Sequence, residues 1–138
     1  MPVPTIIGLF RRASQLMVDE LLSRLDVAGY PGVSASEHLI FENLPPDGAR
    51  VTELAARVGI SHQAAGEVVA ALESRGVLER RADPDDRRAR IVVLTPEGRE
   101  LVRTALHEIA AIERRWTGYL ADAGLPGELG PALAAALE

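Results

Sequence analysis

The side chains best suited to binding chemistry in this chain are arginines. Ten of the 15 basic residues lie between residues 50 and 103, and lysine is absent from the chain. Nine acids share that stretch, so its charge is +1, whereas five arginines and eleven acids elsewhere give −6. The net charge of −5 by itself argues against a nucleic-acid-binding protein. Any contact with a polyanion must therefore lie in the middle of the chain.

Catalysis and metal binding have little support in the sequence. The absence of cysteine excludes disulfides, thiolate zinc sites, iron–sulfur clusters and a cysteine nucleophile. The histidines His38, His62 and His107 lack the spacing of a metal site, and the adjacent Ser61 and His62 would point in different directions at a helix start. No glycine-rich phosphate loop follows a predicted strand. We therefore predict no enzymatic activity, no metal site and no cofactor.

Two short predicted helices would position the arginine-rich region. The first can be capped by Thr52 and can end at Gly59 in a left-handed conformation. Only Ile60 separates this glycine from Ser61, the expected cap of a second helix that runs to Arg75. The inner face of the first helix is expected to consist of Leu54, Ala55 and Val58. That of the second helix is expected to consist of Ala65, Val68, Val69 and Leu72. Two helices joined by a tight turn containing glycine form a helix-turn-helix.

A charged β-hairpin is predicted directly after the helix pair. Residues 77–81 and 90–94 read as strands, and the second is rich in β-branched residues. The Asp-Pro-Asp-Asp sequence at residues 83–86 has turn chemistry. We expect a short strand at Arg50 and Val51 to pair with the hairpin, because three strands on a helix are more stable than an isolated hairpin.

Amphipathic helices are predicted on both sides of this region. Apolar residues spaced by three and four predict a helix over residues 5–25, and Ser34 with Glu37 forms a capping box that begins a short helix. Thr95 and Pro96 begin a helix of about 26 residues, or ~39 Å, and a further apolar stretch follows Pro126. A helix that long cannot bury its whole apolar stripe in so small a domain, so its outer surface needs a partner.

The expected fold is therefore mainly α-helical with a small β-hairpin wing. N-terminal helices for dimerisation and support would occupy residues 1–45, a winged helix-turn-helix residues 46–95, and C-terminal dimerisation helices residues 96–138, in one domain overall. No run approaches the ~18 apolar residues of a membrane span. The beginning of the chain lacks a basic stretch ahead of an apolar run, so a secretory signal is not expected. A cytoplasmic protein is the simplest interpretation.

Six segments occur in the order and spacing of a known family. They are VTELA at residues 51–55, IS at 60–61, LESRG at 72–76, RR at 80–81, DPDDRR at 83–88 and LTPEG at 94–98. With them the chain resembles the MarR (multiple antibiotic resistance regulator) family of bacterial transcription factors. The flanking predicted helices agree in length and order. The resemblance implies a homodimer that binds an inverted repeat of double-stranded DNA and a repressor that a small-molecule effector releases.

The resemblance also implies which residues would contact DNA. The second helix of the pair would lie in the major groove with Ser61, His62, Gln63, Gly66 and Glu67 near its N-terminus. Gln63 can pair with adenine, and Glu67 can accept from cytosine although the family often has arginine there. Gly66 is explained equally well by close backbone approach to DNA and by packing or drift. Candidate phosphate contacts are Thr52, Arg57, Arg75, Arg80 and Arg81.

The predicted wing carries the remaining candidate DNA contacts. Arg87, Arg88 and Arg90 lie in and beside its loop, and arginine fits a narrow, electronegative minor groove. The family pattern of an aspartate, one residue and an arginine falls on Asp86 and Arg88, where the acid braces the loop and the arginine enters the groove. A charge run of this kind is otherwise a solvated surface. The helix pair directly upstream favours the DNA-binding interpretation.

An effector would bind between the dimerisation helices and the winged region, as the resemblance implies. Possible contacts are Arg11, Tyr30, His38, Phe41 and Trp116, although a packing or surface role is the stronger explanation for each of them. Without cysteine the chain cannot sense peroxides through a thiol. The alternative overall function is a winged-helix module that binds another protein and not DNA, which the acidic net charge supports.

Overall fold

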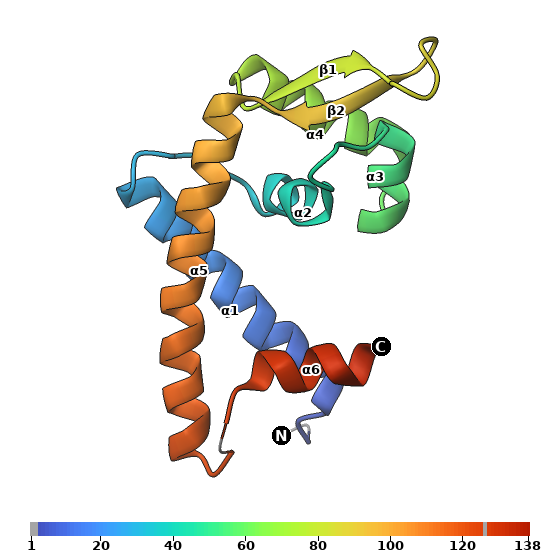
Figure 1. Ribbon diagram of the computed structural model, residues 1–138. Helices are drawn as coiled ribbons and strands as arrows, with labels where there is room; N and C mark the ends of the chain where they lie inside the picture. Colours follow the sequence, from blue (N-terminus) through green and yellow to red (C-terminus); the bar gives the residue numbers. More distant parts are fainter. Residues whose placement is uncertain (1–2, 126) are drawn as a thin grey trace.

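The computed structural model describes residues 3–125 and 127–138, so Met1 and Pro2, inspected above for a secretory signal, and Pro126 lie outside it. Helices and strands follow in an order that confirms the predicted fold class (Figure 1). They are α1 (Ile6–Val27), α2 (Ala35–Asn43), α3 (Val51–Val58), α4 (His62–Ser74), β1 (Leu78–Ala82), β2 (Arg90–Leu94), α5 (Pro96–Asp122) and α6 (Leu129–Leu137). In the described ranges, no helix is long and apolar enough to cross a membrane.

The winged helix-turn-helix contains the best-buried part of the core. Ile40 of α2, Leu54 of α3, Val69 and Leu72 of α4, and Val92 of β2 have fully buried side chains. Of the expected inner positions, Leu54, Ala55, Ala65, Val69 and Leu72 are buried, and Val58 and Val68 are half-buried. The two strands pair antiparallel from Leu78 with Leu94 to Ala82 with Arg90. Because α2, α3, α4 and β2 bury these side chains in one common core, the core holds the helix pair beneath the hairpin.

Local capping residues set the helix starts that the sequence predicts. Ser34 accepts the backbone N–H of Glu37 at 3.1 Å, and the Glu37 carboxylate accepts that of Ser34 at 3.0 Å. The hydroxyl of Ser61 accepts the N–H of Ala64, and that of Thr95 accepts the N–H of Gly98, each at 3.0 Å. These bonds satisfy donors that a helix N-terminus leaves without intrahelical partners.

The start of α3 differs from the sequence prediction. Arg50 and not Thr52 occupies the cap position, and Thr52 is an exposed residue inside the helix. The predicted pairing strand at Arg50 and Val51 is also wrong, because the β-bridge joins Ala49 to Val92 and Val51 already belongs to α3. Ala49 is only 2% exposed, so this small apolar residue fits against the sheet where an arginine would lose its solvation. The first strand also begins at Leu78, one residue later than predicted.

The long helices α1 and α5 pack against each other beneath the winged region, and α6 lies near the first turns of α1 (Figure 1). Arg24 of α1 donates to Glu108 of α5 at 3.0 Å, and Arg115 of α5 pairs with Glu20 of α1. Only Leu21 and Leu25 of α1 are buried, both in its C-terminal half. The N-terminal half of α1 consequently carries apolar side chains without a covering layer.

Candidate nucleic-acid interface

The first turns of α4 form an exposed polar surface. The tight turn at Gly59, with φ of 83°, lets α3 pack across α4, so the apolar side of α4 is buried and its other side faces solvent. Ser61, His62, Gln63 and Glu67 are all exposed, and Gln63 Nε2 lies 3.5 Å from Glu67 Oε1. This surface presents hydrogen-bond donors and acceptors at the end of the helix that carries a partial positive charge.

Gly66 leaves a gap in the side-chain layer of this surface. A Cβ built at Gly66 would meet no other heavy atom within 4 Å in the described structure. Packing within the chain therefore does not require glycine here, although glycine inside a helix costs about 1 kcal/mol relative to alanine. Of the two explanations given above, internal close packing has no support from the fold, which leaves drift and close approach by a partner.

The wing between β1 and β2 presents arginines that have no ion-pair partner among the described residues. Arg87, Arg88 and Arg90 are exposed, and no ion pair among residues 3–125 and 127–138 involves any of them. Arginine side chains that have no carboxylate partner within the chain can neutralise phosphates without first breaking an ion pair. The tip of the hairpin therefore has the free positive charge that the acidic chain as a whole lacks.

A carboxylate beneath the wing holds its loop in place. Arg50 at the start of α3 donates through Nε and Nη2 to Asp83 Oδ2 at 3.0 and 2.9 Å, and Asp83 is 8% exposed. Asp83 Oδ1 accepts the backbone N–H of Asp85 at 2.9 Å, and Asp86 Oδ1 accepts that of Arg88 at 3.1 Å. The loop is thus fixed to the helix-turn-helix through Asp83, and within itself through Asp86.

The same contacts keep Asp83 ionised. The backbone N–H of Asp85 and the Arg50 guanidinium lower the pKa of the Asp83 carboxyl below its usual value. Its stabilising contribution is therefore lost only as the pH falls through this lowered pKa. Sequence reasoning missed the pairing of Arg50 with Asp83. The only local signal was an aspartate at the first position of a turn, because the two partners are 33 residues apart.

The predicted phosphate-binding arginines differ in how they are engaged. Arg57 and Thr52 are exposed, and Arg57 donates weakly to the Asn43 carbonyl at 3.4 Å. Arg80 pairs with Glu73 and Arg81 with Glu79. Arg75 makes the most hydrogen bonds of these residues, because it donates to both oxygens of Glu37 and to the carbonyls of Pro31 and Gly32. Their contacts with phosphate stay a prediction, and Arg75 has a structural role that sequence reasoning did not assign.

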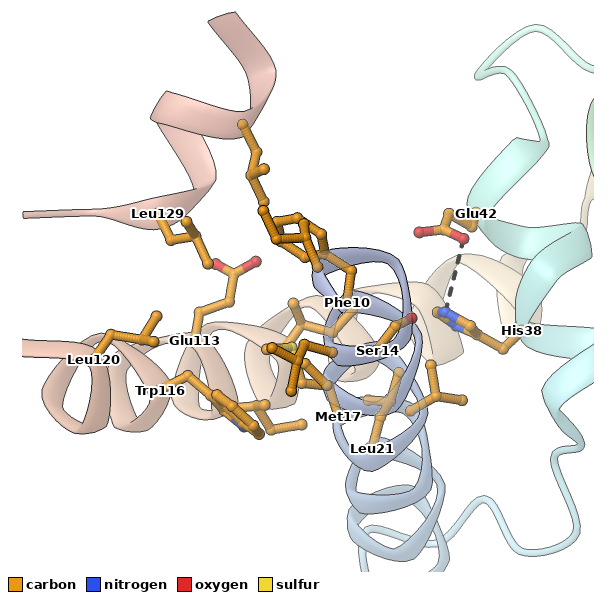
Figure 2. A pocket seen from close by; sticks show the side chains of 17 residues that line it. Phe10, Ser14, Met17, Leu21, His38, Glu42, Glu113, Trp116, Leu120 and Leu129 are labelled. Atoms are coloured by element: carbon orange, nitrogen blue, oxygen red, sulfur yellow. Dashed lines mark ion pairs between the residues drawn. The ribbon is translucent and has the colours of Figure 1, made fainter. Parts of the chain in front are cut away.

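Two apolar cavities flank the junction of the winged region and the long helices. The larger, of about 490 Å³, lies among α1, α2, α5 and α6 (Figure 2). The smaller, of about 300 Å³, lies between α2 and α5 and includes Leu25 and Val33. His38 lines both cavities, Phe41 the smaller and Trp116 the larger, whereas Arg11 and Tyr30 are not among the described residues that line either. Within the described residues, no three His, Asp or Glu side chains gather as a metal site would require.

Comparison with known proteins relates this geometry to a family. Residues 32–89 match the MarR family model. Comparison with the sequences of curated proteins gave no match. Among solved structures, the transcriptional regulator PA3341 is 27% identical with a TM-score of 0.73, and covers 96% of this chain and 92% of its own.

Two further solved structures are described with small molecules. CouR from Rhodococcus jostii, bound to p-coumaroyl-CoA, is 23% identical with a TM-score of 0.73, over 96% of this chain and 88% of its own. BpsR of Bordetella bronchiseptica, whose DNA binding is regulated by 6-hydroxynicotinic acid, is 24% identical with a TM-score of 0.68. The match covers 99% of this chain and 95% of BpsR. The match over residues 32–89 relates the winged helix-turn-helix described above to the MarR family, and the solved structures share the fold of the whole chain.

Proposed function

We propose that the chain is a dimeric, sequence-specific DNA-binding transcriptional regulator, and a repressor that a small-molecule effector releases from DNA. Residues 46–95 bind DNA, and residues 1–45 and 96–138 supply the dimerisation helices. The regulator acts in the cytoplasm and has no catalytic activity. The observation that carries the proposal is an exposed polar first turn of α4 beside a braced hairpin whose three arginines have no ion-pair partner among the described residues.

Each protomer would bind DNA through both elements. The first turn of α4 would enter the major groove, where Gln63 and Glu67 read base edges and Ser61 contacts phosphate. Arg88 would enter the adjacent minor groove, while Asp83 and Asp86 keep the loop in its bound conformation. A loop that is ordered before binding loses less conformational entropy when it meets DNA.

The uncovered apolar side chains support the dimer. Ile6 is 72% exposed, Ile7 74%, and Leu137 of α6 85%, and Leu9 and Phe10 are about half exposed. Ile6, Leu9 and Phe10 also line the larger cavity, together with Leu129 and Leu133 of α6 (Figure 2). A contiguous apolar surface of this kind is typical of an interface. A second copy packed here gives a two-fold dimer, which requires an inverted repeat in the DNA.

Selection of bound fragments from random double-stranded DNA, followed by mobility shifts, tests the proposal. We expect one inverted repeat whose half-sites lie about one helical turn apart, and binding that weakens steeply with salt. Failure to select any sequence at low salt would contradict DNA binding and would favour a winged-helix module that binds protein.

Arg88→Ala is expected to weaken binding to most DNA sequences while leaving the fold intact. The lost side chain is exposed, and its backbone N–H still bonds to Asp86. Each lost phosphate contact should reduce the slope of log affinity against log salt by about 1. Arg103→Ala removes the same charge from α5 and is the control. Equal loss of affinity in the two variants would show that only net charge matters.

Gly66→Ala is expected to stabilise the protein and to weaken DNA binding. The new methyl group meets no atom of the chain, so helix propensity should raise the free energy of unfolding by up to about 1 kcal/mol. The same methyl group would stand between α4 and the DNA if the backbone approaches closely. Thermal unfolding and binding to the selected operator measure the two effects. Unchanged affinity would assign Gly66 to drift.

A further inference from the structure

We propose that the smaller cavity binds a lipophilic cation, an ammonium group carried on an apolar body, and that this compound is the effector. The inference rests on the regulator function proposed above and names the chemical class of its ligand. Its basis is the composition of the cavity wall, which carries a negative charge at one place and is otherwise formed mainly by apolar side chains.

The cavity wall is apolar except at one edge. Among its ten described lining residues, eight are apolar, and the only polar ones are His38 and Glu42 of α2. No arginine lines it, and the chain has no lysine. A volume of about 300 Å³ lies at the lower end of the range for small-molecule sites, and its apolar wall would bury an aromatic or aliphatic body.

Among the described residues, the Glu42 carboxylate has no hydrogen-bond donor, and its ion-pair partner is His38 at the limit of ion-pair distance. His38 Nε2 lies 4.0 Å from Glu42 Oε2, which is too far for a hydrogen bond (Figure 2). Among the described residues no hydrogen bond uses the Glu42 carboxylate or the His38 imidazole. The Glu42 side chain is 61% exposed, so its carboxylate lies at the mouth of the cavity, whereas that of His38 is 16% exposed. An ammonium group at this mouth can donate to the carboxylate while its apolar body enters the cavity.

The wall charge also disfavours an acidic ligand. A carboxylate placed at the mouth would face Glu42, and two like charges in partly apolar surroundings repel each other. The wall offers no guanidinium to offset that repulsion. This chain should therefore differ from BpsR, whose DNA binding responds to 6-hydroxynicotinic acid, a compound with a carboxyl group.

The larger cavity is the weaker site for such a ligand. It is lined by Ile6, Leu9 and Leu133, which belong to the apolar surface assigned above to the second copy of the chain. None of these three residues lines the smaller cavity. His38 and Glu42 line both cavities, whereas the carboxylate of Glu113 lines the larger one and not the smaller, so a substitution of Glu113 separates the two sites experimentally.

The smaller cavity is also linked to the DNA-binding helix. Glu37 immediately precedes His38 and binds Arg75, at the C-terminal end of α4, at 2.9 Å. Arg75 further bonds the carbonyls of Pro31 and Gly32 before α2. A ligand that shifts α2 therefore displaces the contacts that hold the end of α4, which gives its binding a route to the DNA-binding surface.

Three compounds that share one apolar body test the proposal. Calorimetric titration of the full chain without DNA compares 4-phenylbutylamine, 4-phenylbutanol and 4-phenylbutanoate, which carry a positive, a neutral and a negative head group. We expect the amine to bind at least about tenfold more tightly than the carboxylate, a factor that corresponds to about 1.4 kcal/mol. Glu42→Gln should remove this preference, and Glu113→Gln, the matched control in the larger cavity, should retain it.

The outcomes separate this inference from the regulator function. Three results would each overturn the inference: binding of none of the three compounds, tighter binding of the carboxylate, or loss of the preference in Glu113→Gln. The last result would place the amine in the larger cavity, because Glu42 lines both cavities and Glu113 only the larger. Binding of the selected DNA by the same preparations is measured in parallel, so DNA binding without an amine preference leaves the proposed function standing. Thermal unfolding verifies that both glutamine variants remain folded, as expected for substitutions of exposed side chains.

Discussion

Ile6→Asp is expected to convert the proposed dimer into monomers and to weaken operator binding by at least about 100-fold, because two half-sites would no longer be bound by one molecule. Ile6 is 72% exposed in the isolated chain and lines the larger cavity. In the dimer, two-fold symmetry places two such carboxylates in an apolar interface, and burying an unpaired charge costs several kcal/mol. Sedimentation equilibrium measures the assembly, and mobility shifts measure the DNA affinity.

The fold of the single chain should tolerate this change. Ile6 is the first residue of α1, where an aspartate interacts favourably with the positive end of the helix. Val27→Asp is the control, since Val27 is 91% exposed and ends the same helix, where an aspartate is slightly unfavourable. We expect Val27→Asp to remain dimeric. A tight operator complex formed by monomeric Ile6→Asp protein would contradict the dimer geometry.

Gly98→Ala is expected to destabilise the whole chain by at least about 3 kcal/mol and to lower the melting temperature by roughly 10 °C. A Cβ at Gly98 would lie 2.0 Å from the carbonyl oxygen of Val77, and this is a backbone atom that cannot rotate away. The same carbonyl accepts the N–H of Thr95 at 3.2 Å, and the Thr95 hydroxyl donates to the carbonyl of Gly76 at 2.6 Å. The methyl group must therefore separate the start of α5 from the start of the wing.

A second glycine in the same helix provides the control. Gly118 also lies within α5, and a Cβ there would meet nothing within 4 Å. Gly118→Ala should stabilise the chain slightly, through helix propensity alone. Thermal unfolding of both variants followed by circular dichroism compares them. Similar melting temperatures for the two variants would show that α5 can move away from Val77 at little cost.

The Gly98 contact also ties the DNA-binding region to the long helix. Thr95 caps α5 and simultaneously bonds the turn between α4 and β1, so one residue joins three elements. Arg75 makes a comparable junction between α4 and α2. Because both junctions consist of short hydrogen bonds to the backbone or to a carboxylate with little exposure, the winged region should respond as one unit to changes in α2 and α5.

Features that depend on neighbours along the chain could be predicted from the amino-acid sequence. Hydrogen bonds to partners within four residues form the capping box of Ser34 and Glu37, the caps Ser61 and Thr95, and the turn at Gly59. The order of helices and strands along the chain was also predicted correctly. Apolar spacing likewise predicted the buried faces of α3 and α4. The start of α3 was mispredicted because Thr52 is a favourable N-cap residue and Arg50 is not, whereas the bridge of Ala49 to Val92 places the start of the helix directly after Arg50.

Which arginines have ion-pair partners and which do not depends on how the folded chain brings distant residues together. Arg75 and Arg88 are both exposed arginines near the DNA-binding region, yet Arg75 is held by Glu37, 38 residues away, and Arg88 has no ion pair within the described residues. The brace of Arg50 on Asp83 and the cavity edge at His38 and Glu42 also depend on which helices meet. Local sequence fixes hydrogen bonds within a turn or two, whereas the pairing of distant side chains depends on how the whole chain buries its apolar surface.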